Sequence, residues 1–174
     1  LLSFLAAFDV GDRVALAAPG YPAYRNILKA LGIEPVEIPS GPESRFQPSP
    51  ALLDAVPGPL HGLIVASPSN PTGTMLGRAE LAALVDYCGA RGIRLISDEI
   101  YHGITYGREA TSGLALTDDA VVINSFSKYF CMTGWRLGWM VVPPELVRPV
   151  ERLQQNLAIS VPTLSQIAAA AAFD

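Results

Sequence analysis

Short apolar runs rich in β-branched residues alternate with longer stretches of helical periodicity along this chain. Such alternation is typical of βαβ units, in which helices join neighbouring parallel strands. Runs that are apolar at every position predict a sheet that is covered on both faces. The strands are expected at residues 13–17, 35–38, 63–66, 94–97, 120–124 and 137–142.

Helical periodicity predicts helices over residues 24–31 and 78–90, and a Gly92 turn ends the second. Two more are expected after Pro143 and Pro162, the last of them alanine-rich and still in progress at Asp174. Leu1 already lies inside an apolar helical pattern without a cap. The sequence therefore predicts an α/β domain, a three-layer α/β/α sandwich with a mostly parallel sheet, incomplete at both ends.

Two segments interrupt the alternation of strands and helices. Residues 39–50 are polar and rich in proline, and residues 103–117 are rich in turn formers. Both are expected to be surface excursions and not domain linkers, because strands and helices resume directly after them. The length of 174 residues suits one domain with a sizeable core.

Charge and hydropathy limit the classes of partner that the chain is expected to bind. Charged residues make up 16% of the sequence, below the roughly one quarter of ordinary soluble domains, so part of the surface is expected to meet further chain. The net charge of -4 includes no basic stripe, which argues against nucleic acid as a partner of this segment. No apolar stretch is long enough to cross a bilayer, and the first residues lack signal-peptide features, so a cytoplasmic protein is expected.

The two cysteines, Cys88 and Cys131, are far apart and lack CxxC spacing. Neither a disulfide framework nor a zinc site is therefore indicated, and no metal ligands are predicted. Both thiols are expected to be reduced, and Cys88 fits the buried face of a helix.

Polar residues gather directly after three of the predicted strands, at residues 67–73, 98–101 and 125–128. Ligands of open α/β sheets bind outside the carboxyl ends of the strands, so these segments are expected to meet at one crevice. The third segment contains Lys128, one of only two lysines; the other, Lys29, fits an exposed helix position. A partly desolvated lysine can act as an amine nucleophile and form a Schiff base with an aldehyde.

Four motifs together resemble one enzyme family. They are Pro19-Gly20-Tyr21-Pro22, Ser69-Asn70-Pro71-Thr72-Gly73, Asp98-Glu99-Ile100-Tyr101, and Ser125-Phe126-Ser127-Lys128 followed by Thr133-Gly134-Trp135-Arg136-Leu137-Gly138. In this order they resemble the class I and II aminotransferases of the aspartate aminotransferase superfamily, which are fold-type I pyridoxal-phosphate enzymes. The resemblance implies that residues 1–174 are part of the large cofactor-binding domain, and that the N-terminal segment and the small C-terminal domain are absent.

The resemblance also implies catalytic roles. Lys128 would carry pyridoxal 5'-phosphate, and Asp98 would keep the ring nitrogen protonated so that the ring can act as an electron sink. Tyr101 and Asn70 would donate to the phenolic oxygen of the cofactor, and the Asn70-Pro71 bond is expected to be cis. Taken alone, Asp98 could be a turn residue and Tyr101 a boundary aromatic.

The remaining cofactor contacts implied by the resemblance concern the phosphate and the ring face. Arg136, Ser125 and Ser127 would bind the phosphate, although Arg136 alone could equally be a surface ion-pair residue. Tyr21 would stack on the ring, and Tyr24 is expected to be a packing residue.

No functional role can be assigned to Glu99 or His102 from the sequence. Because side chains alternate faces on extended backbone, both are interpreted as structural.

The implied function is transfer of an amino group between an amino acid and a 2-oxo acid, in a full-length protein expected to be a homodimer. Lys128, once released, would shuttle the proton of the substrate α-carbon. Carbon-sulfur lyases and decarboxylases share this set of residues and stay open as alternatives. An aminotransferase-like sensing domain behind a DNA-binding domain is a further alternative, whereas the intact motif set disfavours a degenerate structural homologue.

Overall fold

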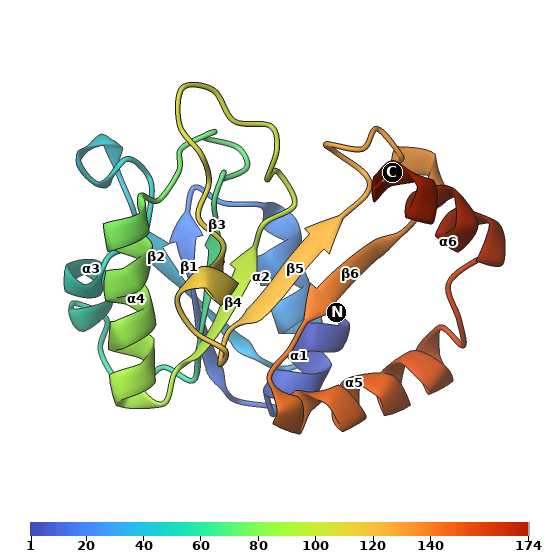
Figure 1. The fold of residues 1–174 in the computed structure, drawn as a ribbon. Coiled ribbons are helices and arrows are strands. Elements are labelled where there is room, and N and C mark those ends of the chain that lie inside the picture. Colours follow the sequence, from blue (N-terminus) through green and yellow to red (C-terminus); the bar gives the residue numbers. More distant parts are fainter. Residues whose placement is uncertain (174) are drawn as a thin grey trace.

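The computed structural model describes residues 1–173, which form a six-stranded sheet flanked by helices (Figure 1). The strand order is β2-β1-β3-β4-β5-β6; the first five strands are parallel, and β6 runs antiparallel to β5. The prediction of a mostly parallel sheet is confirmed. The strands are β1 (Arg13–Ala18), β2 (Glu34–Pro39), β3 (Gly62–Ala66), β4 (Arg94–Asp98), β5 (Val121–Ser125) and β6 (Gly138–Val141).

The helices follow the predicted pattern with one addition. They are α1 (Leu2–Ala7), α2 (Pro22–Ala30), α3 (Pro50–Asp54), α4 (Arg78–Arg91), α5 (Pro144–Leu157) and α6 (Thr163–Ala170). Helix α4 ends as expected at Gly92, whose φ of 66° is left-handed. The short α3 was not predicted; its N-cap is Ser49, whose side chain accepts from the Leu52 amide. The expected continuation of the last helix at Asp174 lies outside the described residues.

The sheet separates two hydrophobic clusters, which confirms the three-layer sandwich. On one face, α3 and α4 pack against the sheet through residues such as Leu53 and Leu84. On the other face, α1, α2 and α5 contribute Phe4, Leu28 and Leu146. Figure 1 shows α3 and α4 on one side of the strands and α1 on the other. Within residues 1–173, no helix is long and apolar enough to cross a membrane.

The two excursions lie mostly at the surface, as the sequence predicted, but a few of their residues are buried. Ser40 and Gln47 of the first excursion are 5% and 3% exposed, and Gly113 of the second is also buried. These polar groups can be buried because each finds a hydrogen-bond partner at or next to the carboxyl end of a strand, namely Ala18, Ala66 and Glu99. The excursions therefore support the predicted crevice.

Candidate functional site

The three polar segments do meet at one edge of the sheet. Strands β3, β4 and β5 are adjacent and parallel, and Ala66 at the end of β3 lies opposite Asp98 at the end of β4. Asp98 in turn lies opposite Ile123 of β5, five residues before Lys128. Parallel pairing therefore places the polar residues of three segments at a single edge of the sheet, namely residues 67–73, 98–101 and 125–128.

Asp98 is a half-buried carboxylate held by two neutral donors. Its Oδ1 accepts from the Ile100 amide at 3.1 Å, and its Oδ2 accepts from the Tyr24 hydroxyl. Burial raises the pKa of Asp98, and these two hydrogen bonds offset the rise in part. Among residues 1–173, Asp98 forms no ion pair with a basic side chain. It can therefore take up a cationic ring nitrogen as its counter-charge.

Tyr24 does more than the packing predicted for it. Its ring packs against the cluster beneath α2, but its hydroxyl donates to Asp98 from the first turn of that helix. Burial raises the pKa of the Tyr24 hydroxyl, and the Asp98 charge adds to this effect, so the phenol stays a donor. The sequence places Tyr24 close to Tyr21. It does not show that the Tyr24 hydroxyl reaches Asp98, 74 residues away along the chain.

Tyr21 is an exposed aromatic residue next to Tyr24. Its side chain is 45% exposed, and its ring meets that of Tyr24 edge-on, with 5.4 Å between the ring centroids. An exposed aromatic face that a neighbouring ring holds in place can stack on a flat ligand.

Lys128 and Tyr101 are neighbours in space. The Nζ atom of Lys128 lies 5.5 Å from the centroid of the Tyr101 ring, within reach of a cation–π contact. The loops after β4 and β5 thus bring amine and phenol together. Lys128 is exposed, so the partial desolvation expected of a nucleophilic lysine is not provided by residues 1–173.

The three residues expected at the phosphate lie on one short segment that runs from the end of β5 to the start of β6. The Ser125 hydroxyl accepts from the Ser127 amide at 3.0 Å, which orders the turn after β5. Arg136 is exposed, has a left-handed φ of 53°, and donates to the Thr133 carbonyl at 2.8 Å. The exposed guanidinium has further N–H donors besides this one, and they can bind an anion.

The turn that carries Asn70 is closed on itself. The Ser69 amide donates to the Thr74 carbonyl at 2.9 Å, and the Gly73 amide donates back to Ser69 at 2.8 Å. The Asn70-Pro71 bond is cis, as the resemblance implied, and so are Ser67-Pro68 and Ala18-Pro19, which were not predicted.

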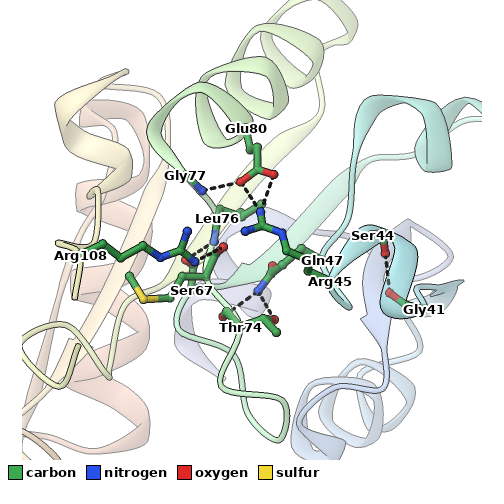
Figure 2. Close-up of polar contacts among 11 residues, drawn as sticks. Gly41, Ser44, Arg45, Gln47, Ser67, Thr74, Leu76, Gly77, Glu80 and Arg108 are labelled. Atoms are coloured by element: carbon green, nitrogen blue, oxygen red, sulfur yellow. Dashed lines mark hydrogen bonds and ion pairs between the residues drawn. The ribbon is translucent and has the colours of Figure 1, made fainter. Parts of the chain in front are cut away.

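Gln47, which sequence reasoning missed, supports this turn from below. Its amide nitrogen donates to the Thr74 carbonyl at 3.0 Å and to the end of β3 at the Ala66 carbonyl, 3.3 Å away. Figure 2 shows the Gln47 side chain reaching Thr74. In the sequence, Gln47 looks like any glutamine of a polar loop, so neither its burial nor its supporting role could be predicted.

The residues that follow the Asn70 turn, Met75 and Leu76, are also fixed by hydrogen bonds. The Ser67 hydroxyl accepts from the Leu76 amide at 2.9 Å, so entry and exit of the segment are joined (Figure 2). Arg108 of the second excursion donates to the Met75 carbonyl at 2.8 Å. The Asn70 turn is therefore fixed from three directions.

A cavity of about 660 Å³ lies away from this site, between the end of α4 and the amino ends of β4 and β5. Cys88, Gly92 and Asp119 are among its lining residues. None of the predicted site residues borders it, and ligands of such sheets bind at the carboxyl ends.

The side chains at the carboxyl edge fit pyridoxal 5'-phosphate by their chemistry. Asp98 offers an anion for the ring nitrogen, Lys128 an amine for the aldehyde, and Arg136 a cation for the phosphate. Tyr101 adds a hydroxyl for the phenolic oxygen, and Tyr21 adds an aromatic face.

Comparison with known proteins agrees with this fit. The family model "Aminotransferase class I and II" matches residues 1–174. A valine–pyruvate aminotransferase of Mycobacterium tuberculosis is 59% identical over 99% of the chain. A crystal structure of an aminotransferase from M. tuberculosis has a TM-score of 0.95 at 56% identity, and covers 99% of this chain and 48% of that one. Thermus thermophilus aspartate aminotransferase with maleate has a TM-score of 0.91 at 31% identity, covering 97% of this chain and 44% of that one.

The chain spans 45% of the length of the valine–pyruvate aminotransferase that it matches. Within that span, the family match and the fold agree. This chain belongs to the class I and II aminotransferase family, whose members depend on pyridoxal phosphate.

Proposed function

We propose that the complete protein containing this chain is an aminotransferase that moves an amino group between an amino acid and a 2-oxo acid. Residues 1–174 would form part of its cofactor-binding large domain. The observation that carries the proposal is the placement of Asp98 and Lys128 at the ends of adjacent parallel strands, with Tyr101 beside the lysine. One group can hold a charged ring nitrogen while the other reaches an aldehyde on the same ring.

Each residue then has a defined task. The cofactor, when bound, supplies the electron sink that makes the substrate α-carbon acidic. Lys128 Nζ would hold the cofactor and, once released, would carry the α-carbon proton. Asp98 would keep a proton on the ring nitrogen, and Tyr101 and Asn70 would donate to the phenolic oxygen. Tyr21 would stack on the face of the ring. The phosphate would be bound by Arg136, Ser125 and Ser127.

We infer valine and pyruvate as substrates, because the relative named for them is 59% identical to the chain. A panel of amino acids and 2-oxo acids, followed by chromatography of the products, tests this inference. Formation of alanine with the 2-oxo acid of valine supports it. Release of ammonia, a thiol or carbon dioxide in place of a new amino acid would assign the lyase or decarboxylase chemistry of the same family.

Lys128→Ala tests the central assignment. Borohydride treatment of the complete protein with its cofactor is expected to fix the cofactor to the peptide that contains Lys128. The Lys128→Ala variant should lose this labelling, whereas Lys29→Ala, at an exposed position on α2, should retain it. Labelling that persists in Lys128→Ala would show that another group holds the cofactor.

We further propose that the complete protein is a homodimer. The low charged fraction of 16% and the exposed Trp135 and Trp139 leave apolar surface that further chain can cover. Light scattering of the purified protein should give twice the monomer mass, and a monomer mass would contradict the proposal.

A further inference from the structure

Tyr101 and Lys128 are each the first residue of a tight turn. The Tyr101 carbonyl accepts from the Ile104 amide at 3.0 Å and closes the Tyr101 turn, residues 101–104. The Lys128 carbonyl accepts from the Cys131 amide at 2.9 Å and closes the Lys128 turn, residues 128–131. Both are β-turns, in which the first residue accepts from the fourth. Where the amine lies relative to the phenol therefore depends on how the two turns pack against each other.

The two turns touch where the Tyr129 ring covers Gly103. Gly103 is the third residue of the Tyr101 turn, and its φ of 88° is left-handed, which favours glycine at this turn position. A Cβ atom on Gly103 would lie 2.5 Å from Cδ2 and 2.7 Å from Cγ of Tyr129. Carbon atoms in contact are about 3.5–4.0 Å apart, and rotation of the ring about its own axis does not move Cγ. The contact therefore requires a residue without a side chain.

The left-handed backbone alone does not distinguish Gly103 from its neighbour in the same loop. Gly107 has a φ of 76°, yet a Cβ atom on Gly107 would meet nothing within 4 Å. The two glycines thus share a backbone conformation and differ in the ring that covers the first of them. Alanine at each position therefore separates the cost of the backbone conformation from the cost of the ring contact.

The Lys128 turn is itself fixed by aromatic packing. Tyr129 meets Phe130 edge-on, with 5.1 Å between the ring centroids, and Phe130 packs against Phe126 with 5.0 Å between theirs. Phe126 is 6% exposed and directly follows β5. A row of three rings therefore connects the buried end of β5 to the backbone of Gly103, and Lys128 lies between the first and the last of these rings in sequence.

We propose that Tyr129 and Gly103 are positioning residues for Lys128. The Tyr129 ring, packed on a residue without a side chain, holds the Lys128 turn against the Tyr101 turn and so sets where the amine lies, 5.5 Å from the centroid of the Tyr101 ring. Under the proposed function, on which this effect rests, Lys128 and Tyr101 serve neighbouring substituents of one cofactor ring, so a shifted turn misplaces the amine. The contact itself can be tested without the cofactor.

The first measurement is urea unfolding of the complete protein without cofactor. Gly103→Ala is expected to lower the unfolding midpoint roughly twice as far as Gly107→Ala, because both variants strain the backbone and only the first also meets a ring. In a Tyr129→Ala background this excess should disappear. Equal shifts of the two glycine variants, or an excess that persists without the ring, would overturn the contact, whether or not the protein is an aminotransferase.

The second measurement separates placement of the amine from general damage to the site. Absorbance follows the attachment of pyridoxal 5'-phosphate to the complete protein. Affinity is measured in parallel for pyridoxine 5'-phosphate, which has an alcohol in place of the aldehyde and cannot react with an amine. Gly103→Ala and Tyr129→Ala are each expected to slow attachment roughly tenfold to a hundredfold and to leave affinity for the alcohol within about twofold of wild type. A merely structural role would weaken both.

Two controls complete the design. Gly107→Ala and the conservative Tyr129→Phe, which keeps the ring, should attach the cofactor at the wild-type rate. The double variant Gly103→Ala/Tyr129→Ala should be no slower than the slower single variant, since both changes break one contact.

Losses that multiply in the double variant, equal losses for the aldehyde and the alcohol, or slow attachment in Tyr129→Phe would overturn the positioning role. If Gly103→Ala does not fold, Tyr129→Ala against Tyr129→Phe makes the same comparison. Failure of the wild type to bind either compound would instead reject the proposed function, and the unfolding measurement would still decide the contact.

Discussion

The Tyr24 hydroxyl donates a hydrogen bond to the Asp98 carboxylate, across 74 residues of sequence and from α2 to the end of β4. The contact aligns a half-buried anion that has no basic partner among residues 1–173. Because Oδ1 is bound to the Ile100 amide, the two hydrogen bonds fix both oxygens of Asp98. The carboxylate is thus oriented by the protein alone.

Tyr24→Phe removes one of these two donors. At neutral pH the charged Asp98 is left with the Ile100 amide alone, so the free energy of unfolding is expected to fall by about 1–3 kcal/mol. Urea unfolding followed by circular dichroism measures the change. Tyr106→Phe is the control, because Tyr106 is 90% exposed. Equal losses in both variants would mean that the bond to Asp98 adds no stability.

Asp98→Asn tests how stability depends on pH. Since the pKa of Asp98 is raised above 3.8, the folded state binds the proton more tightly, and wild-type stability falls as the pH rises through the raised value. The asparagine variant lacks this loss. It is expected to be more stable than the wild type at pH 7, and the difference should shrink as the pH falls toward 3.8.

Urea unfolding at several pH values checks this prediction. Asp118→Asn replaces an exposed carboxylate on the loop before β5 and should show no such trend. A difference between Asp98→Asn and wild type that is the same at every pH would contradict a raised pKa at Asp98.

Gln47→Glu changes a buried donor into an acceptor of the same shape. The amide nitrogen of Gln47 donates to the Thr74 carbonyl, the Thr74 hydroxyl and the Ala66 carbonyl. A carboxylate would repel the two carbonyl oxygens, and it could be satisfied only by the hydroxyl. A loss of about 2–4 kcal/mol in unfolding free energy is expected at pH 7, partly recovered in acid as the new carboxyl gains a proton. Chemical denaturation measures both, with Gln155→Glu at an exposed position of α5 as the control. Equal losses of unfolding free energy in the two variants would show that Gln47 does not support the turn.

Cys88 is expected to resist alkylation in the folded protein. Its side chain is 2% exposed, and burial raises the pKa of its thiol to about 12, so little thiolate forms at neutral pH. Cys131 is exposed on the loop after Lys128 and should react first. Iodoacetamide labelling followed by peptide mass analysis distinguishes the two thiols. Labelling of Cys88 at the rate of Cys131 would show that α4 opens readily.

The sequence predicted the layered α/β architecture because the evidence for it is local. Hydrophobic periodicity, the Gly92 stop signal and the polar segment after each strand depend on neighbours in the chain. The resemblance of the motifs supplied the residues of the candidate site. Their placement at one edge then followed from the rule that parallel strands end on the same side.

Tertiary structure alone decided which distant groups meet. Tyr24 reaches Asp98, Gln47 supports the Asn70 turn, and His102 lies between Glu99 and Ser67 only because helix packing and strand order bring them together. Their sequence context resembles that of ordinary packing and loop residues. Periodicity records which side of an element is buried, whereas a hydrogen bond between elements depends on register, direction and distance that no local pattern contains.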